Sequence, residues 1–168
     1  FSSARLSSDP ADGDYLMRML ARVEGMPLES LRDGVPWSWT GTSEYLDAID
    51  GTLGVNAGFM VGHSALRRVV MGQDATRRAA TPDEVSAMGR LLHDSLDAGG
   101  LGLSSSWART HNDADRHMVP SRYATADESQ INDTRKAELL AHEVEHIDIT
   151  SFDARPIVFP DACQLGQQ

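Results

Sequence analysis

The stretch Val55-Asn-Ala-Gly-Phe-Met-Val-Gly-His-Ser-Ala-Leu-Arg67 decides the fold of this chain. Residues 55–61 are mostly apolar and predict a short buried strand, which ends in a turn formed by Gly62, His63 and Ser64. In parallel α/β proteins, ligands bind beyond the carboxyl ends of the strands. Polar residues directly after a buried strand therefore indicate a functional edge of the sheet.

Helices and a second strand are expected around this stretch. Thr81-Pro-Asp-Glu84 has the N-cap threonine, the N1 proline and the N3 glutamate of a capping box, and predicts a helix over residues 82–98. Residues 101–104 then predict a strand. Strand, helix and strand in this order form a βαβ unit, so the sequence predicts the α/β class with parallel strands.

Further elements are predicted from caps and apolar spacing. Asp14 is placed to cap a helix that ends at Glu24, before Gly25, and residues 1–13 are expected to form a loop. Shorter helices are expected over residues 44–50 and 65–71, and residues 107–123 are expected to form a polar loop. Residues 125–128 resemble a second capping box.

Composition restricts the partners and the environment. The net charge of −10 argues against a nucleic acid or an anionic membrane as partner, because both repel a negative surface. No apolar run approaches the roughly 18 residues that span a bilayer, and the first residues lack the apolar core of a signal peptide. The single cysteine, Cys163, excludes an internal disulfide. A cytoplasmic location is therefore expected.

Five segments within residues 14–128 resemble, in a consistent order, an interior portion of the N-acyl-D-amino-acid deacylases (D-aminoacylases) of the amidohydrolase superfamily. They are residues 19–31, 34–39, 61–67, 70–72 and 78–84. The resemblance implies a partial (β/α)8, TIM-type barrel over residues 1–128. It also implies a hydrolase that cleaves the amide bond of N-acyl-D-amino acids with zinc as cofactor. Residues 129–168 lie beyond it and are expected to form a C-terminal helix and an extended tail.

The resemblance implies an incomplete protein. The family holds its zinc with a His-x-His pair at the first strand, a cysteine soon after, two later histidines and a late aspartate. No His-x-His pair occurs here, and Cys163 lies in the wrong part of the chain. A complete barrel needs about 250 residues. We therefore expect a truncated form or fragment with little activity alone, whose partner is a second copy or the missing remainder of the barrel.

The resemblance also implies the residues that contact a small N-acyl amino acid substrate. They are His63, Ser64, Ser104, Ser105 and Ser106, which match positions near the family's pocket. The alternative interpretation, preferred for His63, is that the histidine holds its loop by hydrogen bonds and that the serines cap strand ends. No Gly-x-Ser-x-Gly motif marks a nucleophile.

Two other groups of residues have metal-binding side chains. The first is His111, Asp113, Asp115 and His117, but their spacing fits no zinc pattern and favours a solvated loop. The second is His142-Glu-Val-Glu-His146. On a helix, His142 and His146 share a face and can bind one zinc, with Glu143 as the general base.

The His142–His146 motif predicts an alternative function, a zinc-dependent hydrolase of the metallopeptidase or deformylase type. The stretch also resembles the last helix of peptide deformylases. Ile149 and Phe152 stand where the extended metzincin pattern has glycine and histidine. The third ligand stays open among Asp148, Asp153, Asp161 and Cys163. The remaining alternatives are a charged, solvated helix and, for the chain as a whole, a non-catalytic remnant or interaction module.

Overall fold

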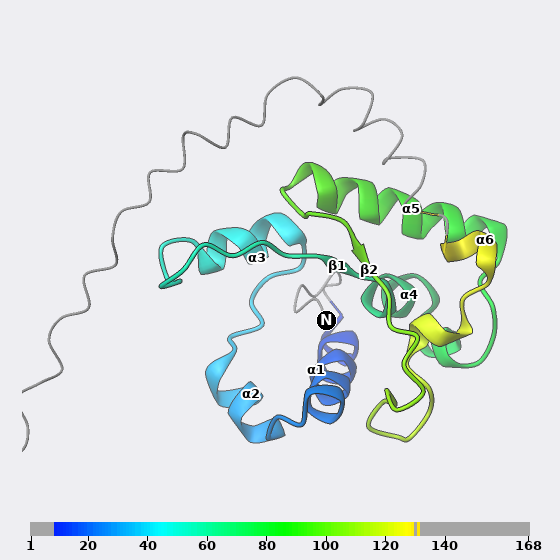
Figure 1. Cartoon of the computed structure of the whole chain (residues 1–168), viewed down its shortest axis with the longest axis horizontal. Helices are drawn as coiled ribbons and strands as arrows, with labels where there is room; N and C mark the ends of the chain where they lie inside the picture. The colour runs from blue at the N-terminus through cyan, green and yellow to red at the C-terminus, as the bar shows by residue number, and fades with distance from the viewer. Residues whose placement is uncertain (1–8, 130, 132–168) are drawn as a thin grey trace, which may run out of the picture.

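The computed structural model describes residues 9–129 and 131, which form helices around a small parallel sheet (Figure 1). The elements in chain order are α1 (Pro10–Glu24), α2 (Leu28–Gly34), α3 (Thr42–Ile49), β1 (Val61–Gly62), α4 (His63–Met71), η1 (Gly72–Thr76), α5 (Pro82–Asp97), β2 (Leu103–Ser104), η2 (Pro120–Tyr123) and α6 (Ala126–Ser129). The α/β class predicted from the sequence is confirmed. None of the described helices is long and apolar enough to cross a membrane.

The sheet consists of β1 and β2, which pair in parallel with Val61 opposite Leu103. The predicted parallel βαβ arrangement is therefore confirmed. The strand predicted over residues 55–61 is shorter than expected, because only Val61–Gly62 has strand pairing. Two residues within the predicted range, Asn56 and Gly58, have low strand propensity, which limits how far the pairing extends.

Two helices begin earlier than the sequence predicted. α4 starts at His63 directly after β1, so the expected Gly-His-Ser turn is wrong, and Gly62 is the N-cap. α1 starts at Pro10 rather than after Asp14. Its N-cap is Asp9, whose carboxylate accepts a hydrogen bond from the backbone N–H of Ala11 at 2.8 Å. Aspartate followed by proline is a strong helix start, so this segment is helical rather than a loop.

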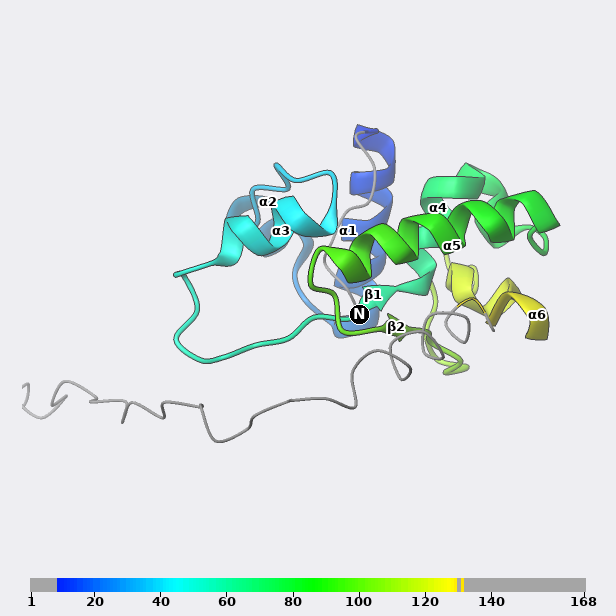
Figure 2. The ribbon, with the colours of Figure 1, turned by 90° about the horizontal axis from the view of Figure 1, so that it is seen from above.

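The capping box predicted for α5 is confirmed. The Thr81 hydroxyl accepts a hydrogen bond from the Glu84 N–H at 3.3 Å, and the Glu84 carboxylate accepts one from the Thr81 N–H at 2.8 Å. α5 then packs along α4, as both views of the ribbon show (Figures 1 and 2). α4 also contacts β1 and η2, so it links the sheet to the segment that precedes α6.

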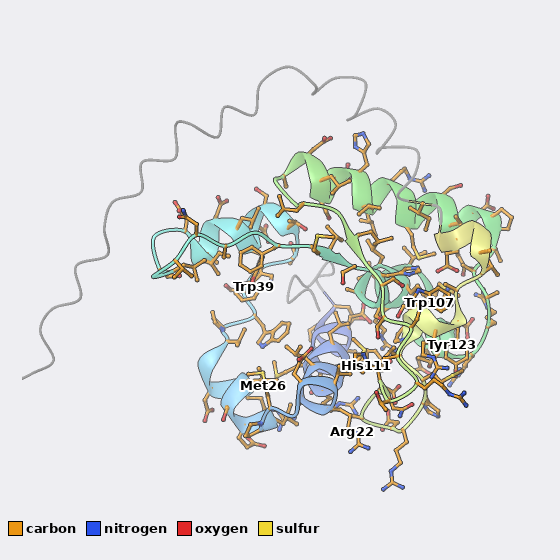
Figure 3. All side chains as sticks on the ribbon, in the orientation of Figure 1. Arg22, Met26, Trp39, Trp107, His111 and Tyr123 are labelled. Carbon is orange, nitrogen blue, oxygen red and sulfur yellow. The ribbon has the colours of Figure 1, made fainter. Side chains whose placement is uncertain are left out.

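The hydrophobic core joins α1, α4 and α5 to the sheet. Leu66 of α4 and Met88 of α5 are fully buried, and Val61 of β1 is nearly so. Trp39 covers an edge of this core, since its ring lies 5.2 Å from the ring of Tyr45 in an edge-on arrangement (Figure 3). The core therefore fixes the start of α4, where the candidate site begins.

Candidate functional site

The residues that the sequence singled out gather where the two strands end. His63 follows β1 directly, Ser104 ends β2, and Ser105 and Ser106 come next. Because the strands are parallel, both ends lie at the same edge of the sheet. The structure brings His63 and Ser105 together, since the imidazole Nδ1 of His63 lies 3.0 Å from the hydroxyl oxygen of Ser105.

His63 is fully buried and has partners on both ring nitrogens. Its Nε2 lies 2.9 Å from a carboxylate oxygen of Glu128, which comes from α6 and is also fully buried. Ser105 is exposed, so it forms the outer end of this chain of contacts. The geometry agrees with the interpretation that His63 holds its loop by hydrogen bonds. Substrate contact by these residues stays a prediction.

Arg67 lies one helical turn after His63 and completes a buried charged cluster. Its Nη1 contacts both carboxylate oxygens of Glu128 at 2.5 Å. Its Nη2 donates to the carbonyl oxygens of Ala75 and Arg78 at 3.2 and 2.8 Å, which ties α4 to the segment after it. The Nε of Arg67 is buried and has no hydrogen-bond partner among the described atoms.

The pKa of Glu128 results from opposing effects. Burial raises the pKa, but hydrogen bonds from His63 and Arg67, together with the charge of Arg67, bring it below its usual range. Glu128 is therefore ionised at neutral pH, and this buried carboxylate is paired with the buried guanidinium of Arg67. A buried charge of this kind is tolerated only where such a partner is present.

Ser64 and Ser106 also connect the two strand ends to η2. The Ser64 hydroxyl donates to the hydroxyl of Ser121 at 3.1 Å, and that hydroxyl donates to the Ser106 carbonyl oxygen at 2.9 Å. The Ser106 hydroxyl lies 2.6 Å from Nδ1 of His111, in the loop that Figure 3 labels with Trp107 and His111. These contacts hold the loop after β2 against the start of α4.

The polar loop is organised around Asp113. One carboxylate oxygen accepts hydrogen bonds from the backbone N–H groups of Asp115 and His117 at 3.0 and 2.8 Å. The other accepts one from the Tyr15 hydroxyl of α1 at 3.1 Å. Burial and the neighbouring Asp113 raise the pKa of Tyr15 well above its usual range. Asp113 is buried, so the expectation of a solvated loop is wrong at this residue.

No metal cluster forms in the part of the chain that the structure describes. There, no group of three or more histidine, cysteine, aspartate or glutamate side chains is arranged to hold a metal ion. Asp113 lies within the loop, and the Nδ1 atom of His117 is 3.6 Å from the Asp113 carboxylate. Within the loop, Asp113 accepts hydrogen bonds from the backbone N–H groups of Asp115 and His117, so this carboxylate stabilises the loop.

The comparison with known sequences decides the family. A sequence model of the amidohydrolase family matches residues 8–161. The chain belongs to the amidohydrolase family. Among its relatives, an uncharacterised protein of Mycobacterium tuberculosis (strain H37Rv) is 38% identical over 132 residues, which are 71% of this chain and 21% of the relative. The D-aminoacylase of Alcaligenes xylosoxydans xylosoxydans is 40% identical over 80 residues, which are 47% of this chain and 16% of that protein.

Solved structures of D-aminoacylase also align with this amidohydrolase chain. One, described for its binuclear metal centre, is 34% identical, covers 62% of this chain and 20% of its own, and has a TM-score of 0.46. Another, obtained with copper chloride, is 32% identical, covers 70% of this chain and 22% of its own, and has a TM-score of 0.48. The mycobacterial relative matches most of this chain, but the match spans only 21%, about a fifth, of that relative's length.

The family resemblance predicted from the sequence is thus confirmed, and the match extends past residue 128. It therefore includes the segment with His142, Glu143 and His146. These three residues and Cys163 lie outside the described residues, as does the helix expected after residue 129. Zinc binding by the His142–His146 motif stays a prediction.

Sequence reasoning missed the two charged residues that hold the site together. Arg67 was part of a matching segment and Glu128 part of a capping box, but neither was assigned to the site. A signal was present for Arg67, because a spacing of four residues places it on the same helix face as His63. Glu128 had no comparable signal. Its amide donates to the Thr125 hydroxyl at 3.2 Å as expected, but its carboxylate points to residues about sixty positions earlier.

Proposed function

We propose that this amidohydrolase chain is the interior part of a metal-dependent N-acyl-D-amino-acid deacylase and has little activity alone. The parallel pairing of β1 and β2 carries the proposal, because it places His63 and Ser105 together at the carboxyl ends of the strands. In (β/α)8 enzymes this end of the strands carries the active site. The two strands would be neighbours in a partial barrel of this type.

The proposed metal would be held by residues outside the described part of the chain. The described residues alone do not fit a zinc site, since they offer no cluster of suitable ligands. Bound zinc would polarise the scissile amide and activate water. This chain's residues would contact and orient the small N-acyl amino acid through exposed groups at the strand ends, Ser105 among them.

The partner of the chain would be the remainder of the barrel or a second copy, and neither nucleic acid nor membrane is proposed. A (β/α)8 barrel closes its sheet, so a segment of it leaves strand edges unpaired. The described sheet has β1 and β2 as its members, and each has an outer edge without a strand in the part of the chain that the structure describes.

A deacylation assay tests this proposal. The 168-residue chain is assayed alone, and also within a chimera in which it replaces the matching segment of the Alcaligenes D-aminoacylase. Release of free D-amino acid from N-acetyl-D-amino acids is measured with zinc present, and circular dichroism checks that each protein is folded. The matched controls are the corresponding N-acetyl-L-amino acids and the chimera after metal removal.

The expected result is activity in the folded chimera with the D-substrates and almost none with the chain alone. Efficient hydrolysis by the 168-residue chain alone would overturn the view that it is incomplete. A folded, metal-loaded chimera that releases no D-amino acid would overturn the assignment as a deacylase segment.

A further inference from the structure

The charge states of the groups at the strand ends determine which of them donate hydrogen bonds. Arg67 only donates, and an ionised carboxylate such as Glu128 only accepts. The contact of 2.9 Å between Glu128 and His63 therefore requires the proton of His63 to be on Nε2. A neutral imidazole has one N–H, so its Nδ1 is then an acceptor.

The same logic extends to the exposed end of the chain of contacts. With Nδ1 of His63 as an acceptor, the Ser105 hydroxyl must donate its single proton across the 3.0 Å contact. The Ser105 oxygen keeps two lone pairs and has no proton left for a ligand. Ser105 is exposed, whereas His63, Arg67 and Glu128 are fully buried.

We propose that Arg67, Glu128 and His63 form a positioning relay that makes the Ser105 hydroxyl a dedicated hydrogen-bond acceptor for a ligand. The ligand class that such an atom recognises carries an N–H or O–H donor. If the proposed function holds, on which this assignment of the ligand rests, the donor is the amide N–H of an N-acyl amino acid. The relay itself does not depend on that function.

Burial keeps His63 in one tautomer, and so keeps the direction of its hydrogen bonds unchanged. An exposed histidine exchanges tautomers and partners with water, but His63 has no accessible surface and both of its ring nitrogens are occupied. Glu128 is ionised because Arg67 and His63 lower its pKa against the effect of burial, which raises it. The ionised carboxylate excludes the opposite tautomer, in which Nε2 would face it without a proton.

The first experiment reads the tautomer directly. Two-bond proton–nitrogen NMR spectra of the 168-residue chain with nitrogen-15 histidine assign the protonated nitrogen of His63 in the pH range where its imidazole is neutral. We expect proton occupancy on Nε2 and a bare Nδ1. The Glu128→Gln variant removes the constraint and is expected to give a mixed tautomer, whereas Glu24→Gln on the exposed part of α1 leaves the spectrum unchanged. An Nδ1–H tautomer in the unmodified chain overturns the relay, even if Glu128→Gln fails to fold.

The second experiment tests recognition in the folded chimera described above. Its binding constant is measured for an N-acetyl-D-amino acid and for the ester analogue in which oxygen replaces the amide N–H. We expect the analogue to bind about two- to tenfold more weakly, as for one neutral hydrogen bond. Ser105→Ala should abolish this difference and Ser105→Thr should retain it.

The outcomes separate the relay from the proposed function. Equal discrimination in the unmodified protein and in Ser105→Ala would overturn recognition by Ser105 while leaving the deacylase proposal standing. Failure of both ligands to bind would overturn the ligand class and the deacylase proposal together. The NMR result on His63 would stand in either case, because it needs no ligand.

Discussion

Glu128 is ionised within the protein because Arg67 supplies an opposite charge, and Arg67 and His63 supply the hydrogen bonds that water would otherwise provide. The sequence indicated where His63 would lie, since a polar residue after a buried strand has a limited set of positions. It did not indicate Glu128 as its partner. That pairing depends on how α6 returns to α4, and local patterns contain no information on such a long-range approach.

Replacing Glu128 tests how much the buried pair contributes. Glu128→Gln keeps the shape of the side chain but leaves the buried guanidinium of Arg67 without its counter-charge. We expect the free energy of unfolding to fall by about 3–5 kcal/mol, the cost of removing one partner of a buried ion pair. Urea denaturation measures it. The control, Glu24→Gln at an exposed position, should change stability by no more than about 0.5 kcal/mol.

The stability contribution of Glu128 should also depend on pH. Its pKa in the folded protein lies below the ordinary value, so folding favours the ionised form. The contribution is fully present above the unfolded pKa of about 4.3 and is lost as the pH falls through the lower pKa of the folded state. The stability difference between the unmodified protein and Glu128→Gln should therefore shrink in acid. A difference that stayed constant down to the acid-unfolding range would contradict this.

At the scale of elements, helix starts were predicted well where the cap is local. Thr81 and Glu84 form their capping box in the structure as the four-residue pattern indicated. The Asp9-Pro10 start of α1 is an equally local signal, but the sequence prediction placed the cap at Asp14. The positions of the strands were predicted correctly, but their lengths were not. The length of a strand depends on the neighbouring strand with which it pairs, and a strand's own residues do not specify that neighbour.

The capping box should contribute measurably to stability. Thr81→Ala removes the hydroxyl that accepts the Glu84 N–H, so we expect a loss of about 1 kcal/mol in the free energy of unfolding. Chemical denaturation measures the change. Ser86→Ala is the matched control, because the Ser86 hydroxyl bonds only to the carbonyl of Pro82 within the helix, and alanine is a better helix former. Equal destabilisation by both variants would show that the cap has no special effect.

Glu84 should titrate at an unusually low pH for a partly exposed carboxylate. Hydrogen bonds from Arg78 and from the Thr81 backbone lower the pKa of Glu84 to about 2. The cap interaction is thus present above the unfolded pKa of about 4.3 and is lost only as the pH falls through about 2. NMR titration of the Glu84 carboxyl carbon measures this value. In Arg78→Gln the pKa should move up toward 4.3, and an unchanged value would contradict the assigned cause.

At the scale of the whole molecule, the described part combines a packed core with a sheet of two strands. The core buries residues from α1, α4 and α5, which gives these helices a defined arrangement. Several large apolar side chains are nevertheless exposed, among them Val55, Leu101 and Trp107 at 68%, 69% and 55%. Exposed apolar side chains of this size favour contact with another surface.

The isolated 168-residue chain should therefore associate with itself. Strand edges and apolar side chains that lack a cover favour contact with another copy, because contact removes them from water. We expect light scattering to show a mass that rises with protein concentration. Leu101→Lys places a charge beside the sheet and should shift the onset of association to higher concentration. Met26→Lys is the matched control, since Met26 is also exposed but lies at the connection between α1 and α2 (Figure 3). A monomer at every concentration would show that the open sheet needs no partner.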